Sequence, residues 1–289
     1  MNIRDRFKNL AAWAVLLALC LLICFPVFLL LSGSVTGEYE MAQRLLPMAA
    51  GKPPQEGEFV TWRWMPEFPE FLEYGTLLFA SPQFFTLFWN SVKMTGLTLL
   101  GEMAVAVPAA WAFAVYRFPA RKYIFTAYIV LMLLPFQVTM LSQYLVLHGM
   151  KLMDTQWAVI LPGIFAAFPV FLIYRSFSEI PESLLEAARI DGAGEWRCFC
   201  RVGIPLAQGG VASAFVLQFL ECWNLIEQPL AFLEDQALWP LSLYLPRIGI
   251  RQAGFGMAAS VITLLPALCV FAFGQEYLEQ GISASGIKG

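Results

Sequence analysis

The sequence is poor in charged residues and in histidine. Only 13% of its 289 residues are charged, whereas 59% are hydrophobic. Soluble domains carry about 25% charged and roughly 45–50% apolar residues. This imbalance excludes an ordinary soluble domain and predicts a chain that crosses a membrane several times. The net charge of −3 decides little, because charges in a membrane protein matter by position.

Few residues are available for catalysis or metal binding. His148 is the only histidine, so a catalytic triad or a multi-histidine site would rest on one residue. The six cysteines form no CxxC pair, and the close pair Cys198 and Cys200 has no histidine beside it. Zinc sites and disulfide scaffolds need richer clusters. We therefore expect no metal site and interpret the cysteines as small apolar packing residues.

The sequence also lacks a phosphate-binding loop. No G-x-x-x-x-G-K-[S/T] motif occurs anywhere in it, and this motif cradles nucleotide phosphates in many ATPases. We expect no cofactor on this chain and no nucleic-acid partner. Any energy from ATP would have to come from another chain.

Long apolar segments are what the sequence has instead. A helix that crosses about 30 Å of hydrocarbon needs about 20 apolar residues. Six segments meet this need, at residues 10–31, 84–116, 123–147, 157–177, 207–230 and 255–273. The first is longer than the apolar part of a signal peptide, so we expect a retained anchor. Prolines that should kink these helices are Pro26, Pro108, Pro135, Pro162, Pro169 and Pro266.

The predicted organisation follows from these spans. Residues 1–31 form the N-terminus and the first span, 32–83 an extracytoplasmic loop, 84–274 a core with five spans, and 275–289 a C-terminal tail. The 32–83 loop is rich in proline and acids, and its aromatic residues suit the membrane interface or a partner. Those aromatic residues are Trp62, Trp64, Phe68, Phe71 and Tyr74.

Basic residues indicate the orientation. With the N-terminus inside, the cytoplasmic side receives Arg4, Arg6, Lys8, Arg117, Arg121, Lys122, Arg175, Arg189, Arg197, Arg201 and Lys288. The outside receives Arg44, Lys52, Arg63, Lys93, Lys151, Arg247 and Arg251. Because cytoplasmic loops carry an excess of Lys and Arg, both termini are expected in the cytoplasm.

A charged segment at residues 181–205 separates the fourth and fifth spans. Ser183 and Glu186 form an S-x-x-E pattern typical of a capping box that starts a helix. Gly192 supplies the stop, because glycine accepts the left-handed conformation that ends helices. Trp196, Phe199, Cys200 and Gly203 then recur at the spacing of one helix face. The pattern predicts two short helices joined by a turn, which could insert into a groove on a soluble partner.

This segment resembles the EAA loop of ABC importer permeases. The matching residues are Glu186-Ala187-Ala188, then Gly192, then an aliphatic–x–aliphatic–Pro ending formed by Val202, Ile204 and Pro205. Two further stretches resemble the carbohydrate-importer branch, with the smaller permease of maltose-type systems as the nearest type: Trp223-Asn224 with Pro229-Leu230, and the tail from Gln275 to Gly289. The resemblance covers residue 84 to the end and leaves out the 32–83 loop.

The resemblance implies an all-α membrane protein with about six transmembrane helices and a cytoplasmic coupling loop. It implies a non-catalytic permease in a bacterial or archaeal inner membrane, which moves a sugar or oligosaccharide. The implied partners are a second permease, an ATPase dimer that binds ATP and Mg²⁺, and an extracytoplasmic solute-binding protein. The implied ATPase-coupling residues are Glu186, Ala187, Ala188, Asp191, Gly192, Trp196, Phe199, Ile204 and Pro205, with the C-terminal tail as a second contact.

Polar residues within the spans are candidates for the solute path. Intramembrane acids usually face a bundle interior, a partner or a cavity, and Trp223 and Asn224 could stack on and hydrogen-bond to a sugar. The candidates are Glu102, Glu221, Trp223 and Asn224. For Glu102 and Glu221, structural pairing is the alternative reading.

Other functions stay open at this point. A permease for glycerol-phosphate, polyamine or amino acid is the first alternative, although a phosphate-bearing solute would favour basic residues that the spans almost lack. An intramembrane enzyme would need convergent catalytic groups at membrane depth. A passive scaffold or receptor would not explain the spaced loop.

Overall fold

The computed structural model describes residues 3–49 and 63–286 and is built from helices. Among these residues the only β-pairing is an isolated bridge between Thr36 and Pro69. The chain divides into two compact units: unit 1 comprises Met1–Phe85 and Leu245–Leu265, and unit 2 comprises Thr86–Tyr244 and Pro266–Gly289. The predicted all-α membrane fold is confirmed. The predicted 84–274 core stays a prediction, because residues 245–265 group with unit 1.

The helices of unit 1 begin with a long apolar one. They are α1 (Ile3–Ser34), α2 (Glu38–Ala49), α3 (Leu72–Ala80), two short 3₁₀ turns (Leu245–Arg247 and Ile250–Gln252) and the first part of α15 (Ala253–Gly286). In α1, residues Ala12–Ser34 are apolar enough to cross a membrane, and residues 12–28 of that stretch are exposed in the described protein. Such a helix needs lipid or another subunit around it.

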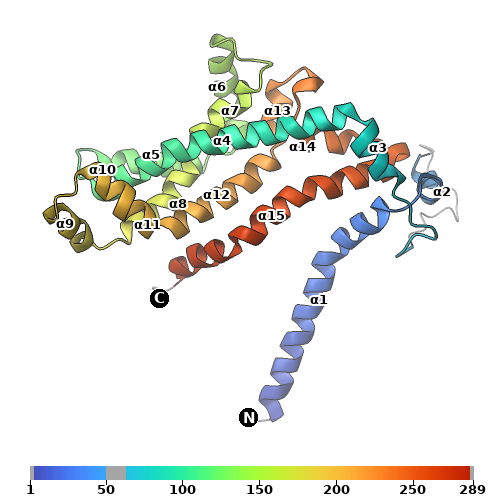
Figure 1. Cartoon of the computed structure of the whole chain (residues 1–289), viewed down its shortest axis with the longest axis horizontal. Helices are drawn as coiled ribbons and strands as arrows, with labels where there is room; N and C mark the ends of the chain where they lie inside the picture. Colours follow the sequence, from blue (N-terminus) through green and yellow to red (C-terminus); the bar gives the residue numbers. More distant parts are fainter. Residues whose placement is uncertain (1–2, 50–62, 287–289) are drawn as a thin grey trace. The chain divides into compact units, whose positions relative to one another are not determined.

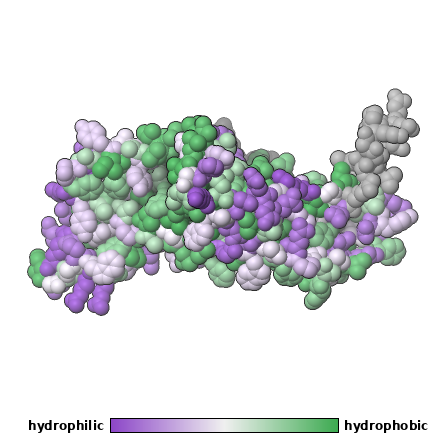
Figure 2. Space-filling model, turned by 90° about the horizontal axis from the view of Figure 1, so that it is seen from above, coloured by the Kyte–Doolittle hydropathy of each residue, from purple (hydrophilic) through white to green (hydrophobic). Residues whose placement is uncertain are grey.

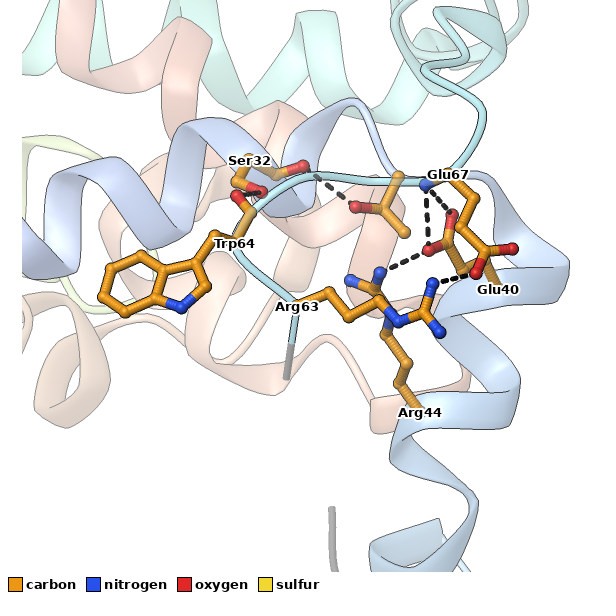
Figure 3. Close-up of polar contacts among 7 residues, drawn as sticks. Ser32, Glu40, Arg44, Arg63, Trp64 and Glu67 are labelled. Carbon is orange, nitrogen blue, oxygen red and sulfur yellow. Dashed lines mark hydrogen bonds and ion pairs between the residues drawn. The ribbon is translucent and has the colours of Figure 1, made fainter. Parts of the chain in front are cut away.

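The predicted 32–83 loop is a folded segment in its described part (Figure 3). Ser32 Oγ donates to the Trp64 carbonyl oxygen at 2.8 Å, and the Glu67 N–H donates to the Glu40 carboxylate at 3.2 Å. Ion pairs join Glu40 to Arg44 and Arg63 to Glu67. These contacts hold the chain entering α3 against the end of α1 and the start of α2.

The aromatic residues predicted for this loop differ in their exposure. Trp64, Phe68 and Phe71 are 66%, 75% and 68% exposed, whereas the Tyr74 hydroxyl donates to Ser34 Oγ at 2.7 Å. Trp62 lies outside the described residues. Three large exposed aromatic side chains suit the membrane interface or a partner surface, and that placement stays a prediction.

Unit 2 holds most of the spans (Figure 1). Its helices are α4 (Pro82–Val115), α5 (Arg121–Met132), α6 (Phe136–Gly149), α7 (Trp157–Ile164), α8 (Ala167–Ser178), α9 (Glu182–Ile190), α10 (Glu195–Cys198), α11 (Ile204–Leu206), α12 (Gln208–Trp223), α13 (Glu227–Phe232), α14 (Leu241–Tyr244) and the second part of α15. In this unit α9 and α10 lie at one end of α8 and α12, and α6, α7 and α13 lie at the other end.

The described residues contain between four and six candidate membrane crossings, a range that includes the predicted six. Four helical stretches are long and apolar enough to cross: Ala12–Ser34, Pro82–Val115, Trp157–Ser178 and Ala253–Leu278. Two bent pairs raise the number to as many as six: Arg121–Met132 with Phe136–Gly149, bent by 104°, and Glu195–Leu206 with Gln208–Trp223, bent by 72°.

The prolines in the spans have two different effects. Pro26, Pro108 and Pro266 lie inside α1, α4 and α15, which continue past them. Pro135 instead stands in extended conformation at the break between α5 and α6, where its ring disfavours helix in the preceding residue. Pro162 lies two residues before α7 ends at Ile164.

The core of unit 2 is centred on the Trp111 side chain of α4. Its indole ring makes edge-to-face contact with Phe177 of α8 at 5.2 Å between ring centroids, and lies 5.6 Å from Phe199. Ile173 and Cys198 beside them are fully buried. Aromatic pairs of this kind add about 0.5–1.5 kcal/mol beyond the burial of area. The core thus fixes residues 198 and 199 to the bundle.

Candidate functional site

The first helix of the 181–205 segment, hereafter the EAA element, begins two residues earlier than its sequence pattern predicts. Pro181 is the N-cap of α9 in extended conformation, and no side chain caps the helix. The predicted capping box of Ser183 and Glu186 is therefore wrong, because helical geometry starts at Glu182 and places Ser183 inside the first turn. The negative charge of Glu182 interacts favourably with the positive, N-terminal end of the helix dipole.

Helix α9 presents the EAA residues outward. Leu185 is buried in the unit 2 core, and Ala188 is half-buried against it. Glu186 and Ala187 are exposed. The helix is therefore held on one side and offers a small, negatively charged surface on the other.

The turn after α9 needs a glycine. Gly192 has φ +83°, and a Cβ added to it would meet no heavy atom within 4 Å. The constraint is therefore one of backbone conformation and not of space. The Ala193 N–H donates back to the Ala188 carbonyl at 3.0 Å, as in common glycine-terminated helix ends. The prediction that Gly192 stops α9 is confirmed; Asp191 caps the helix end and is exposed.

The second leg of the EAA element contains a π-helical turn at Phe199–Gly203, between α10 and α11. The residues of the predicted apolar face differ in burial: Phe199 and Gly203 are buried, whereas Trp196 is 72% exposed, although its ring lies 5.4 Å from that of Phe199 between centroids. A π turn holds one extra residue, which rotates the side chains before it relative to those after it. Ile204 is half-buried against the core, and Pro205 is exposed.

Gly203 brings this leg into the closest contact with α4. A Cβ on Gly203 would lie 2.4 Å from Cζ3 of the Trp111 ring. Since real Cβ atoms do not approach other atoms so closely, only glycine fits without movement of the indole. The aromatic core and this contact together anchor the EAA element to the bundle.

Charged contacts join the two legs and their neighbours. Arg189 Nε donates to Glu195 Oε1 at 2.9 Å, and the Tyr116 hydroxyl donates to Glu195 Oε2 at 3.2 Å. Arg117 pairs with Glu182 at 3.4 Å. All these groups are substantially exposed, so each pair contributes about 0–1 kcal/mol at most and mainly sets orientation. Figure 2 shows hydrophilic side chains gathered at the α9–α10 end of unit 2.

Of the four predicted path residues, only Glu221 lines a pocket, and the role of all four in a solute path stays a prediction. Glu221 is exposed and lines a pocket of about 490 Å³, while Trp223 is buried between the rings of Phe88 and Phe219. Asn224 is exposed and donates to the Leu220 carbonyl at 2.8 Å. None of the other three lines the pocket that Glu221 lines.

Glu102 lies inside the helix bundle. Its side chain is fully buried, and within the described residues neither carboxylate oxygen has a hydrogen-bond partner. A buried polar group without a partner is costly. The structure therefore places Glu102 in the packing of α4 and not on an open surface.

Three glutamines of the pocket were missed by the sequence interpretation, as were the hydroxyl residues Ser91, Thr95, Thr98 and Thr139. Gln143, Gln218 and Gln228 line it together with Glu221. Each glutamine appears in the sequence as a single uncharged amide within an apolar segment, and only the acidic and aromatic residues and Asn224 of the spans were taken as candidates.

Known proteins share this architecture. Residues 104–284 match the family described as "Binding-protein-dependent transport system inner membrane component". The chain is similar to the arabinooligosaccharides transport system permease protein AraQ of Halalkalibacterium halodurans, with 30% identity over 71% of this chain and 75% of that protein. It is also similar to the sn-glycerol-3-phosphate transport system permease protein UgpE of Shigella flexneri, with 30% identity over 70% of this chain and 74% of that protein.

A solved structure has the same fold. It is the crystal structure of a bacterial ABC transporter involved in the import of the acidic polysaccharide alginate, with a TM-score of 0.78, 21% identity, and coverage of 96% of this chain and 98% of that chain. The matches agree on a non-catalytic subunit that spans the membrane several times. The chain belongs to the family of binding-protein-dependent transport system inner membrane components.

Proposed function

We propose that this permease is one half of the translocation path of an ATP-driven importer for a sugar or oligosaccharide. We further propose that the EAA element receives the force of ATP hydrolysis from a separate ATPase. The observation that carries the proposal is the structure of that element. It is exposed at Glu186 and Ala187 and anchored to the bundle at Phe199 and Gly203.

This structure suits rigid-body coupling between α9 and the membrane spans. The exposed part of α9 is small enough to enter a groove, and Ile190 beside it is 87% exposed. Movement of α9 would pass through the turn at Gly192 and the ion pair of Arg189 with Glu195 to the aromatic core around Trp111. Packed cores move as units and do not deform continuously, so the spans would turn with the element.

The proposed partners supply the functions that this chain does not carry itself. An ATPase dimer that binds ATP and Mg²⁺ would dock on α9, since the sequence holds no phosphate-binding loop. A second permease would complete the path, and the family description supports a solute-binding protein on the outer side. Both termini would lie in the cytoplasm. The proposed C-terminal contact falls partly on residues 287–289, outside the described residues; α15 is helical up to Gly286.

A carbohydrate is the proposed solute class. The arabinooligosaccharide permease supports it, while the glycerol-3-phosphate permease at equal identity keeps an anionic solute as the second candidate. The pocket in unit 2 favours the first, because no lysine, arginine or histidine is among the residues that line it.

Photocrosslinking in native membranes tests the coupling role. A photoreactive amino acid placed at Ala187 should crosslink to an ATPase chain identified by mass spectrometry. The same amino acid at Ala237, exposed in the loop between α13 and α14, should not. Equal yields at both positions, or a product at Ala187 that contains no ATPase, would overturn the proposed docking.

A further inference from the structure

Residues 63–72 of unit 1, hereafter the fold-back segment, bring Trp64 against the side of α1. The Trp64 ring lies 5.7 Å from the Phe25 ring and 6.1 Å from the Phe28 ring, between centroids. The hydrogen bond from Ser32 to the Trp64 carbonyl fixes the same approach (Figure 3). A segment that the sequence predicts as part of an extracytoplasmic loop thus touches the flank of a membrane span.

This contact lies well below the end of the apolar stretch of α1. That stretch, Ala12–Ser34, has 23 residues, which is about 34 Å of helix against about 30 Å of hydrocarbon. Phe28 precedes Ser34 by about 9 Å along the helix axis, and Phe25 precedes it by about 14 Å. The Trp64 ring therefore lies at the depth of the lipid, in the leaflet in which α1 ends.

The outward surface of the fold-back segment is apolar. Half of its residues are large apolar side chains that the protein leaves exposed, namely Trp64, Met65, Phe68, Phe71 and Leu72. Exposed apolar patches mark contact with a protein or a membrane, and tryptophan is enriched where hydrocarbon meets water. Because residues 12–28 of α1 are also exposed and Trp64 touches them, the patch continues the apolar surface of the span.

The backbone of the fold-back segment needs little water. Pro66 and Pro69 have no N–H group, and the N–H groups of Glu67 and Glu70 donate to protein oxygens at 3.2 and 2.9 Å. Because hydrocarbon offers no hydrogen-bond partners, non-helical backbone is stable beside it only where the protein supplies them. At these four positions the segment meets that condition.

The charged side chains of the segment do not oppose insertion. Arg63 pairs with Glu67, and Glu40 of α2 pairs with Arg44, so these four charges cancel in two pairs. The fold-back segment carries one arginine against two glutamates, so attraction to anionic lipids cannot hold it at a membrane. Its affinity for lipid must come from the apolar side chains.

We propose that the fold-back segment is an interfacial anchor that binds the phospholipid leaflet in which α1 ends. Trp64 packs on the span, and Phe68 and Phe71 insert among the lipids beside it. In the proposed orientation this is the outer leaflet. The anchor fixes the depth of α1 in the bilayer, and it depends neither on the coupling role nor on the transported solute.

Photocrosslinking in native membranes tests the anchor. A benzophenone amino acid in place of Phe68 should form adducts of phospholipid mass, identified by peptide mass spectrometry. The same amino acid at Leu17, which is exposed in the apolar stretch of α1, should form them too. At Gln236, which is exposed in the loop between α13 and α14, it should not. Adducts of position 68 with protein alone, or a lipid yield no higher than at Gln236, overturn the proposal.

Two variants distinguish contact with lipid from exposure to water. The Phe68 side chain is exposed, so its replacement removes little contact within the protein. In phosphatidylcholine nanodiscs, Phe68→Asp should accelerate hydrogen exchange of the Glu70 amide about fivefold, because the segment loses apolar area in the lipid.

Phe68→Leu is the matched control. It keeps an apolar side chain at the same position, so its Glu70 amide should exchange at nearly the wild-type rate. Wild-type exchange in both variants would place the Phe68 side chain in water and overturn the anchor. Equal acceleration in both would assign the effect to packing of the phenyl ring within the protein, which also overturns it.

Discussion

The missing Cβ of Gly203 defines how closely the EAA element meets the indole of Trp111: a methyl group there would lie 2.4 Å from ring atom Cζ3. The same ring contacts Phe177 and Phe199. One aromatic side chain of α4 thus receives both the membrane helix α8 and the second leg of the EAA element. Three predictions concern this arrangement and the EAA element, and a fourth concerns α3 in unit 1.

Gly203→Ala should destabilise the protein by about 1–3 kcal/mol, the range for an overpacked core, because the indole ring cannot yield without disturbing Phe177. Thermal unfolding of the purified chain in detergent measures the effect. Gly96→Ala is the control, since a Cβ at Gly96 meets nothing within 4 Å and alanine favours helix more than glycine. A wild-type Tm for Gly203→Ala would contradict the contact.

Gly192→Ala should cost about 1–2 kcal/mol for a left-handed backbone, while Gly192→Asn should cost less because asparagine tolerates that region. The space around Gly192 is open, so the size of the side chain should not matter. Hydrogen exchange of residues 182–195 measures the local opening. Equal exchange in the alanine and asparagine variants would show that backbone strain is not the cause.

Trp196→Ala and Phe199→Ala should separate docking from folding. Phe199 is buried and its truncation should cost about 3–5 kcal/mol, whereas Trp196 is 72% exposed and its loss should leave Tm nearly unchanged. Copurification of an ATPase with the chain is the second measurement. A Trp196→Ala protein that keeps its Tm but loses the ATPase would place Trp196 in the docking surface; retention of the ATPase would remove it.

Glu73→Gln should change the pH dependence of α3. Burial, and then the nearby Glu38 charge, raise the pKa of Glu73 above its ordinary value. A carboxyl with a raised folded pKa binds its proton more tightly in the folded state, so stability increases as pH falls through that pKa. The protection factors of α3 amides, which are exchange rates corrected for the intrinsic pH dependence of exchange, should therefore rise between neutral and mildly acidic pH. The protection factors of Glu73→Gln should stay constant in this range, and an equal rise there would assign the effect to another group.

Much of the fold was predictable, because apolar length alone identifies membrane spans. The spans at 84–116 and 157–177 agree closely with α4 and with α7–α8. Bends were less predictable: Pro135 breaks a span while Pro108 lies in a continuous helix. The same residue type gives both outcomes, since neighbouring helices decide whether the freed backbone groups find partners.

The candidate site was predictable in its turn and not in its register. Gly192 predicted a left-handed backbone conformation, and this constraint comes from the backbone alone and not from the space around the residue. Trp196 and Phe199 have rings in contact, with centroids 5.4 Å apart, yet Trp196 is 72% exposed and Phe199 is buried. Helical periodicity also assumes a constant number of residues per turn, which the π turn at Phe199–Gly203 does not keep. The buried glutamines of the pocket were also hidden, because burial of an amide in an apolar span depends on tertiary packing.

Helix α12 holds the pocket and the EAA element apart. Gln208 begins the helix beside the second leg, and Glu221 lies 13 residues later, which corresponds to about 20 Å along the axis. Substitutions that alter the walls of the pocket are therefore far from the exposed turn of the EAA element. The two ends of α12 can accordingly change independently during evolution.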